Sequence, residues 1–579
     1  MGKRIGAIVG RAARGESFFM SITRRELLRR AGLLGVASLI PSFTACTDDG
    51  GSEGEGETGD TDETGETGGD DLPIYEWEGE AGPASVFSHG IASGDPLADS
   101  VILWTRVSPD DPAAELFFEV ALDPEFSQRV AADWLGAPDA ARDNTFKLDL
   151  DGLAPATTYY YRFWIQGVSS VIGRTRTAPD GASEHLRFAV CSCSSLAHGY
   201  FHGYRHIGAR ADLDAVIHLG DYIYEYASGD YGDVREYEPS HEILTLDDYR
   251  MRHAQYKRDP DLQVAHRQHP FIATWDDHEI ANDGWVGGAE NHDIEEGEWA
   301  ARRAAGIQAY FEWMPIREGT PGRVYRQLAY GDLVDLIVLD TRYEGREQQV
   351  PLSAMDSLAQ INDPERQLLG AEQEAWLLER LSSSTAQWKL LCQQILMGQI
   401  ILTPGQDGEP NRPFISDPWD GYEAARRTVY QHIADSGITD VVVLTGDIHT
   451  SWANELAVNP ADPISYDPET SDGAVAVEFV TPGITSPGLP VDQATINLLL
   501  TNNPHVKWVE LNHRGYMTID IKSERVHCDW WHLDVDAVES PQPATPTHAM
   551  SFSVESLVPR LLEQSGPAAE KADAPALAP

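Results

Sequence analysis

Basic residues are scarce in this sequence, and their scarcity limits what the protein can bind. The 579-residue chain has 43 Lys and Arg against 92 Asp and Glu, which gives a formal net charge of −49 at pH 7. Such a surface repels nucleic acid and anionic membranes, so we expect no nucleic-acid-binding surface. A phosphate substrate is still compatible with this charge, because bound cations and a few arginines can reverse the local field.

Cysteine is also rare, and its distribution indicates no disulfide framework. The chain has five cysteines, which suits a protein that folds in the cytoplasm before export. Cys191 and Cys193 are close together in the sequence, on a predicted strand. Alternate residues of an extended strand point to the same face, and this geometry does not favour a disulfide between them. We therefore expect one cysteine of this pair to have a chemical role.

The N-terminal region lacks an apolar run long enough for a permanent membrane-spanning helix. The run at residues 31–40 is too short to cross a bilayer. It follows Arg24 and Arg25 in a Thr-Arg-Arg-x-Leu-Leu context that resembles a twin-arginine export signal, whose partner is the twin-arginine translocation machinery. The basic end of an ordinary helix is the alternative. Because the arginines lie deep in the chain, translation starts either at Met1 or at Met20.

The predicted signal covers residues 1–46 and ends at a candidate lipid-attachment site. Phe43-Thr-Ala-Cys46 resembles a bacterial lipoprotein box, although the phenylalanine matches it poorly. Residues 47–71 contain eleven acids and no base, and this composition cannot form a core. Residues 47–78 are therefore either the tether of a protein anchored through Cys46 or the disordered tail of a soluble enzyme. We expect the mature protein in the periplasm, at the cell surface or outside the cell.

Residues 79–180 have the pattern of a small fibronectin/Ig-like β-sandwich. Short runs at 101–105, 115–121 and 158–165 are rich in β-branched and aromatic residues and are separated by Pro, Asp and Gly. The segment that leads to Tyr159 resembles the turn before a late strand of fibronectin-type sandwiches, where a tyrosine packs at a corner. We expect a structural spacer, with an adhesive module as the alternative.

Residues 181–540 alternate between apolar strands and helical patterns, which favours an α/β core. Helices are predicted at residues 364–381 and 422–434. Residues 541–579 are rich in Ala and Pro, and residues 551–562 within them either dock as a short helix or fray. The predicted strands are residues 186–190, 215–219, 271–275, 333–339, 389–392, 441–445, 515–521 and 525–533.

Five of these strands end in acidic or metal-binding residues. In an open α/β sheet such ends face one crevice. A single Asp after a strand is usually a turn or helix-capping residue, but several carboxylates at one place repel one another unless cations separate them. The strand ends lead to Cys193, Asp221 with Tyr224, Asp276 with Asp277 and His278, Asp340 with Arg342, and Asp447 with His449.

The types of side chain indicate which metals would bind. Carboxylate and amide oxygens suit hard ions such as Ca²⁺, whereas imidazole, phenolate and thiolate suit a transition metal. A mixed site with Asp221 shared between ions would use every type present. Two metals about 3.5–4 Å apart can hold the attacking and leaving oxygens of a phosphoryl transfer.

Several motifs together resemble the alkaline phosphatase D, or PhoD-type, family of phosphatases and phosphodiesterases. The resemblance implies a calcineurin-like metallophosphoesterase two-sheet α/β sandwich after a small β-sandwich, with Fe³⁺ and two calcium ions, in a monomer. The motifs are Gly-Asp-Tyr-Ile-Tyr-Glu at 220–225, Trp-Asp-Asp-His-Glu at 275–279 with Asn282, Gly-Asp-Ile-His at 446–449 with Trp452, and further segments at 87–95, 103–106, 192–200 and 339–342.

The same resemblance assigns roles to residues. Asp221 would bridge iron and calcium, and Asp277 and His278 stand where related enzymes place a metal-binding Asn and a phosphate-steadying His. Which of Asp276 and Asp277 touches metal is left open. Asp340 and Arg342 would lie at the rim, where Arg342 would contact phosphate. The remaining expected ligands are Cys193, Tyr224 and His449 for iron, and Asn282 and Asp447 for calcium.

The substrate is not determined by these motifs. They fit a phosphate monoesterase, a diesterase and a phospholipase D-like phosphodiesterase equally. A calcium-binding surface lipoprotein without activity is a further alternative, but it predicts a missing ligand, and none of the expected ligands is missing.

Overall fold

The computed structural model describes residues 72–403 and 411–579, which belong to the compact unit Gly69–Pro579. The predicted export signal, the lipid-attachment residue Cys46 and most of the acidic segment lie outside the described residues. In the part of the chain that is described, no helix is long and apolar enough to cross a membrane.

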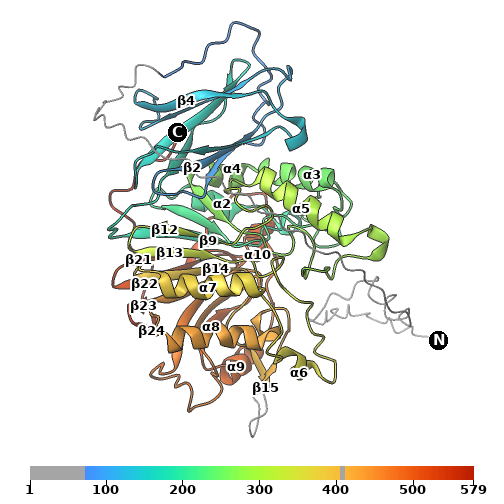
Figure 1. Ribbon diagram of the computed structural model, residues 1–579, viewed down its shortest axis with the longest axis vertical. Helices are drawn as coiled ribbons and strands as arrows, with labels where there is room; N and C mark the ends of the chain where they lie inside the picture. Colours follow the sequence, from blue (N-terminus) through green and yellow to red (C-terminus); the bar gives the residue numbers. More distant parts are fainter. Residues whose placement is uncertain (1–71, 404–410) are drawn as a thin grey trace, which may run out of the picture. The chain divides into compact units, whose positions relative to one another are not determined.

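Two large mixed sheets form the framework of the unit (Figure 1). The ten-stranded sheet has, in spatial order, β24 (Val558–Glu563), β23 (Thr547–Glu555), β22 (Arg525–Leu533), β21 (Arg514–Lys522), β9 (Leu186–Cys191), β10 (Ala215–His218), β11 (Pro270–Ala273), β1 (Ile91–Gly94), β2 (Val101–Arg106) and β5 (Thr145–Leu150). The seven-stranded sheet has β12 (Arg326–Tyr330), β13 (Val334–Val338), β14 (Trp388–Gln393), β17 (Val441–Thr445), β19 (Ala474–Val480), β18 (Ser451–Ala457) and β20 (Val506–Glu510).

The inner faces of the two sheets share one apolar core. It contains Phe188 of β9, Leu336 of β13, Leu444 of β17 and Ile519 of β21, all of them buried. Strands β9, β10 and β11 run parallel, as do β13, β14, β17 and β19. Parallel strands that are buried on both faces read as continuous apolar runs, which is why the sequence located all of these strands except β19 within one or two residues.

Helices cover the outer faces. Helices α7 and α8 pack on the seven-stranded sheet, as Figure 1 shows, whereas α2 to α5 share a second apolar cluster with β9, β10 and β11. The helices are α2 (His202–Gly208), α3 (Leu246–Lys257), α4 (Pro260–Gln268), α5 (Trp299–Trp313), α6 (Ser357–Ile361), α7 (Ala371–Ser383), α8 (Glu423–Asp435), α9 (Gln493–Asn502) and α10 (Val535–Glu539), with short 3₁₀ turns at Ala140–Arg142, Leu196–His198, Ile294–Glu296 and Trp419–Gly421.

The N-terminal β-sandwich shares a sheet with the rest of the unit. One layer is β4 (Arg129–Gly136), β3 (Leu116–Ala121) and β6 (Thr158–Ile165), extended by β7 (Val168–Ser169) and β8 (Gly173–Arg176); the other is β1, β2 and β5. Strand β1 pairs with β11, so this second layer continues the ten-stranded sheet. The corner interaction is present, since the Tyr159 hydroxyl accepts a hydrogen bond from the Ala154 amide at 2.8 Å.

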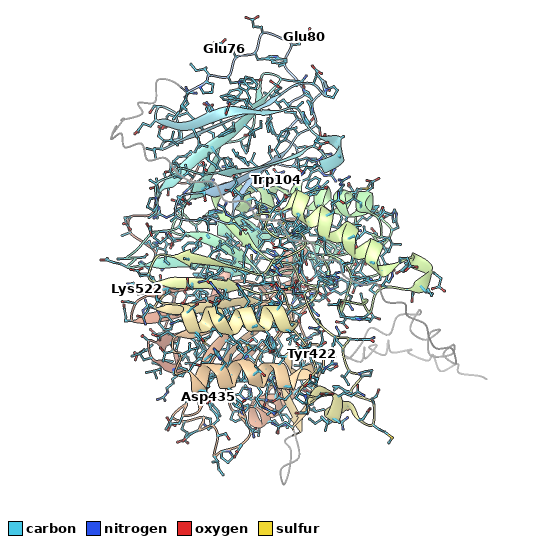
Figure 2. The ribbon with its side chains drawn as sticks, viewed as in Figure 1. Glu76, Glu80, Trp104, Tyr422, Asp435 and Lys522 are labelled. Carbon is cyan, nitrogen blue, oxygen red and sulfur yellow. The ribbon has the colours of Figure 1, made fainter. Side chains whose placement is uncertain are left out.

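A buried tryptophan fixes the junction between sandwich and helices. Trp104 of β2 is labelled in Figure 2, and its indole nitrogen donates to the Glu312 carbonyl at 2.8 Å. Its ring centroid lies 5.8 Å from that of Trp313. Helix α5 is therefore attached to the shared part of the ten-stranded sheet.

Two secondary-structure predictions are wrong. Residues 551–562 form no helix but lie in β23 and β24, which extend the ten-stranded sheet beyond β22. Pro559 opposes a helix interior, and Phe552 and Val554 alternate with serines as strand residues do. The helix expected at 364–381 begins only at Ala371. A short antiparallel pair, β15 (Ile401–Thr403) with β16 (Arg412–Pro413), completes the strands.

Candidate metal centre

Four of the predicted ligands adopt a strained backbone conformation. Cys193, Asp221, Asp447 and His449 have φ angles of 59°, 52°, 60° and 60°. Non-glycine residues rarely adopt this left-handed region, which costs about 1–3 kcal/mol for each residue and persists where the surroundings enforce it. The loops after β9, β10 and β17 thus turn sharply at the positions where ligands were expected.

These loops bring a thiol, a carboxylate and an imidazole together. The ligand atoms of Cys193, Asp221 and His449 all lie within 4.8 Å of one another. The Tyr224 hydroxyl donates to Asp221 Oδ2 at 3.0 Å and lies 3.2 Å from His449 Nε2. The four residues predicted to hold iron therefore form one group.

A second group of carboxylates adjoins the first. Ligand atoms of Asp276, Asp277 and Asp447 lie within 4.8 Å of one another, and so do those of Asp221, Asp277 and His278. Asp221 belongs to the thiol group and to one carboxylate group. The geometry therefore offers neighbouring cation positions that share Asp221.

Bound positive charge would stabilise the ionised forms of the buried acids and the thiol at the centre. Burial raises the pKa of Asp276 well above its ordinary value, and burial with neighbouring acids raises the pKa of Asp447 to about 8 despite Arg342. Burial also favours neutral Asp221, but His278 and His449 outweigh it and lower its pKa to about 2. Burial and nearby Asp221 raise the pKa of the Cys193 thiol well above its usual value. Bound cations would allow all these groups to ionise together.

Two buried carboxylate oxygens are candidates for direct contact with a metal. Asp221 Oδ1 and Asp276 Oδ2 are buried and have no hydrogen-bond partner among the described residues. A buried carboxylate oxygen without a partner is costly, and native proteins rarely leave one unless it has a functional role. Thiol, imidazole and phenol on one side, and carboxylates on the other, are the donor types that a transition metal and calcium require.

Arg342 is buried, although the sequence predicted that it would lie at the rim of the site. Its side chain is 0% exposed, and its guanidinium donates to Asp276 at 2.5 Å, to Asp417 at 2.9 Å and to Asp447 at 2.6 Å. The carboxylates that surround it could not be buried without a counter-charge, so they draw the arginine inward. Arg342 is therefore a positioning residue for two predicted ligand carboxylates.

His278 is buried inside the centre, and Glu225 fixes one nitrogen of its ring. Its Nδ1 is 2.7 Å from Glu225 Oε2, and its ring centroid is 4.3 Å from that of Tyr224. Burial lowers the pKa of His278, but Glu225, Asp221 and Asp277 outweigh this effect and raise it well above its ordinary value. The imidazole can therefore carry a proton towards an anionic substrate.

Asn282 is joined to the centre through Glu225, the partner of His278. The amide group of Asn282 donates to Glu290 at 3.2 Å, and its backbone nitrogen donates to Glu225 at 2.8 Å. Its role as a calcium ligand stays a prediction. Asp340 is buried and does not lie at the predicted rim, because it accepts hydrogen bonds from the backbone nitrogens of Arg342 and Tyr343. Cys191 is a buried side chain among apolar residues.

Three further residues, none of them predicted from the sequence, support the centre. Glu279 accepts from the backbone nitrogens of Tyr222 at 2.6 Å, Asp276 at 2.7 Å and Asp221 at 3.1 Å, so it joins two ligand loops. Ser486 lies 2.6 Å from the Tyr224 hydroxyl. Asp417 pairs with Arg342 and Arg346. Of the three, only Glu279 belongs to one of the motifs named above, and its neighbours in the sequence do not distinguish it from a surface acid.

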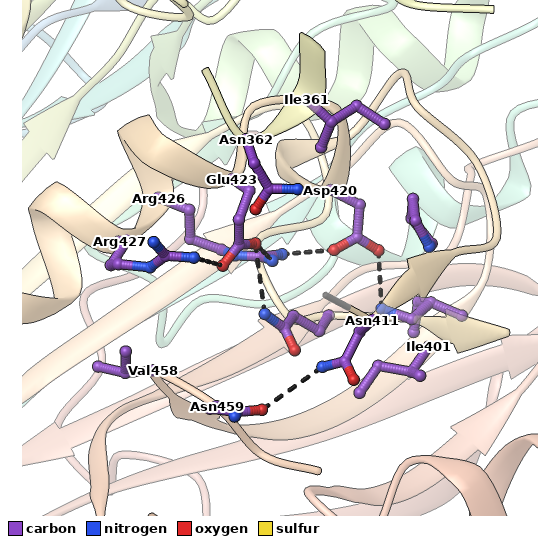
Figure 3. A pocket seen from close by; sticks show the side chains of 13 residues that line it. Ile361, Asn362, Ile401, Asn411, Asp420, Glu423, Arg426, Arg427, Val458 and Asn459 are labelled. Carbon is purple, nitrogen blue, oxygen red and sulfur yellow. Dashed lines mark hydrogen bonds and ion pairs between the residues drawn. The ribbon is translucent and has the colours of Figure 1, made fainter. Parts of the chain in front are cut away.

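A separate cavity near α8 does not belong to the centre. It has a volume of about 490 Å³ and contains none of the predicted site residues. Its charged groups pair with one another, as Figure 3 shows for Arg426 with Asp420 and for Arg427 with Glu423. Little net charge is left there to attract a phosphate.

A two-sheet α/β sandwich with these ligands on its strand-end loops defines the class as a metallophosphoesterase-like hydrolase. The family model for PhoD-like phosphatases matches residues 188–530, and the model for their N-terminal domain matches residues 76–179. The chain therefore belongs to the PhoD-like phosphatase family and is a phosphoric ester hydrolase.

Known relatives agree with this assignment. Alkaline phosphatase D of Bacillus subtilis (strain 168) is 39% identical over 470 residues, which cover 77% of this chain and 77% of the relative. A solved structure of PhoD is 36% identical, with a TM-score of 0.75 over 86% of this chain and 94% of that one. A purple acid phosphatase from seeds of yellow lupin (Lupinus luteus) is 12% identical, with a TM-score of 0.53 over 82% and 74%, and shows the fold alone. The predicted family and fold class are confirmed.

Proposed function

We propose that this phosphatase is an exported, metal-dependent enzyme that hydrolyses phosphate monoesters, diesters or both, with Fe³⁺ and two Ca²⁺ ions as cofactors. The observation that carries the proposal is the pair of buried, unpartnered oxygens, Asp221 Oδ1 and Asp276 Oδ2, inside a cluster of four aspartates. Such a cluster is expected to be stable in the ionised state only with bound cations.

The donor types divide the ligands between the two kinds of ion. Cys193, Tyr224 and His449 would hold iron together with Asp221, which would also face calcium. The calcium side would use Asp277 and Asp447, with Asn282 as a further candidate. When bound, the cations supply Lewis acidity that stabilises the charge on the phosphoryl oxygens.

The side chains around the predicted ligands orient them, and His278 would donate a proton. His449 Nδ1 donates to the Pro487 carbonyl at 3.0 Å, which leaves Nε2 directed towards the centre. Glu225 holds His278 so that its other nitrogen can donate a proton to a phosphoryl or leaving-group oxygen. Arg342 balances the charge of Asp276 and Asp447 and fixes their positions.

Elemental analysis and a visible spectrum of the purified protein test the metal assignment. We expect iron and calcium, with a tyrosinate-to-iron charge-transfer band. Zinc alone, with no visible band, would contradict the iron assignment. Parallel assays with p-nitrophenyl phosphate and bis(p-nitrophenyl) phosphate test the substrate class, and a strong preference for the diester would exclude the monoesterase and favour a phospholipase D-like diesterase.

Export is tested separately in cells. Changing Arg24 and Arg25 to Lys together should retain the protein in the cytoplasm, because a twin-arginine signal requires that pair. The matched control changes Arg29 and Arg30 to Lys and should leave export intact. Metabolic labelling with a fatty acid tests the lipid anchor, and label that persists in Cys46→Ser would exclude it.

A further inference from the structure

A second cluster of metal-binding side chains lies outside the catalytic centre. Glu510 is the last residue of β20, His513 lies in the turn before β21, and His532 belongs to β22. Their ligand atoms lie within 4.8 Å of one another. None of the three belongs to the groups that form the catalytic centre.

The two imidazoles present the same nitrogen to the carboxylate. Nδ1 of His513 lies 2.9 Å from Glu510 Oε1, and Nδ1 of His532 lies 4.0 Å from Glu510 Oε2. The rings are stacked, with centroids 5.4 Å apart and an interplanar angle of 5°. Both Nδ1 atoms thus lie within 4.0 Å of the Glu510 carboxylate.

The outer nitrogens of both rings have partners on the opposite side. Nε2 of His513 lies 3.4 Å from Asp534 Oδ1, and Nε2 of His532 lies 2.9 Å from the Ser451 hydroxyl. Metal-binding histidines usually have this arrangement, in which a partner at the far nitrogen fixes the tautomer and orients the ring. The arrangement therefore points to a ligand at the Nδ1 atoms.

We propose that Glu510, His513 and His532 form a separate binding site for a divalent transition ion, with Zn²⁺ as the ion that suits them best. Two imidazoles and one carboxylate are a common donor set for Zn²⁺ with a fourth position open to water. Calcium prefers an all-oxygen shell, so these donors select against the ion expected in the catalytic centre.

The protonation states at neutral pH suit metal binding. Burial lowers the pKa of His532 to about 4, although Glu510 opposes the shift. Burial raises the pKa of Glu510, but hydrogen bonds from His513 outweigh this and leave it lowered. A neutral imidazole and an ionised carboxylate are the forms that bind a metal.

The ion would join the two sheets beside the catalytic loop. Glu510 belongs to the seven-stranded sheet and His532 to the ten-stranded sheet. The connecting segment contacts the loop that orients His449, since Leu489 donates to the Leu511 carbonyl and Arg514 donates to the Thr485 carbonyl at 3.2 Å. Binding should therefore stabilise the folded enzyme and restrain this loop.

Zinc titration of the enzyme as purified, with its own metals in place, tests the site. We expect one additional Zn²⁺ per chain by calorimetry and elemental analysis after gel filtration, with a rise in Tm. His513→Ala should weaken this binding by at least about tenfold and abolish the rise in Tm. Glu510→Gln, which keeps the side-chain shape, should weaken binding in the same way and remains informative should His513→Ala fail to fold.

Matched variants separate this site from the others. His241 also lies beside one carboxylate, Asp248 at 3.1 Å, so His241→Ala should leave zinc binding unchanged. Asp221→Asn changes the catalytic centre and should also retain the additional zinc. The proposal is overturned by three results: no retained zinc, equal binding in both site variants and the wild type, or loss of zinc in Asp221→Asn alone. None of them depends on the assignment of iron or calcium.

Discussion

Buried carboxylates are treated differently in the N-terminal sandwich and in the metal centre. Glu119 of β3 is buried in the sandwich, and its Oε1 accepts from Arg162 at 2.6 Å and from the Trp164 indole at 2.9 Å. Asp221 and Asp276 each keep one buried oxygen without a partner. Both regions bury acid, but only at the centre do described carboxylate oxygens remain without a protein partner.

The two regions also differ in where their backbone is strained. Strands β3 and β6 follow a regular antiparallel register, and left-handed residues such as Ala156 and Gln166 lie in the turns of the sandwich. Cys193, Asp221, Asp447 and His449 are instead left-handed at predicted ligand positions. Strain and unsatisfied polar groups usually persist only where function requires them. Removing a carboxylate should therefore affect chemistry at the centre and stability in the sandwich.

The largest effect is expected for Asp221→Asn. It removes the carboxylate that both kinds of ion would share, so kcat/KM should fall by about 10³-fold or more, roughly 4 kcal/mol of transition-state stabilisation. Steady-state kinetics with metal content measured on the same sample check this. Glu119→Gln is the control and should leave kcat/KM within about twofold; an equal loss in both variants would remove the contrast between the regions.

Tyr224→Phe should have the next largest effect. The phenol lies 3.0 Å from Asp221 and 2.6 Å from Ser486, and its loss should lower activity by about 10–100-fold. The visible band should disappear while circular dichroism stays unchanged. Tyr231→Phe, which alters a neighbouring ring whose centroid lies 5.6 Å from that of Tyr224, should keep the band. A band that persists in Tyr224→Phe shows that this tyrosine does not bind iron.

Glu279→Gln should have an intermediate effect through the ligand loops. An amide can accept through only one atom, so at least one of the backbone donors held by Glu279 loses its acceptor. We expect the calcium concentration needed for half-maximal activity to rise about tenfold. An unchanged calcium dependence with lower thermal stability would indicate a purely structural role.

The smallest effect is expected for Tyr159→Phe in the sandwich. The Ala154 amide loses its hydrogen-bond acceptor, which should reduce the free energy of unfolding by about 1 kcal/mol. Urea denaturation of the full chain measures this. The kcat should not change, and a drop in kcat would mean that the shared ten-stranded sheet transmits strain from the sandwich to the centre.

The sequence predicted those parts of the fold that depend on local pattern. Strands β6, β17 and β22 have the predicted bounds, whereas β9 differs by one residue at one end and β21 by one residue at each end. The group of Cys193, Asp221, Tyr224 and His449 was also predicted, because each residue follows a recognisable strand in a motif. Such features are specified by adjacent residues and need no knowledge of the partner strand.

Features that depend on distant partners were missed. Arg342 was expected at the rim because its own segment does not show that Asp276, Asp417 and Asp447 surround it. Residues 551–562 were expected to form a helix because β23 pairs with β22, which is distant along the chain, and β24 in turn pairs with β23. Long-range pairing and charge compensation overrode local propensity in both places.

By itself, the sequence determined the strand–loop units, the chemical types of the ligands and the family. Only the tertiary structure decided that β1 extends the catalytic sheet, that Arg342 is buried as a counter-charge, and that Glu510, His513 and His532 converge. The physical reason is that apolar periodicity is encoded along the chain, whereas the field at a carboxylate depends on every charge brought near it by folding.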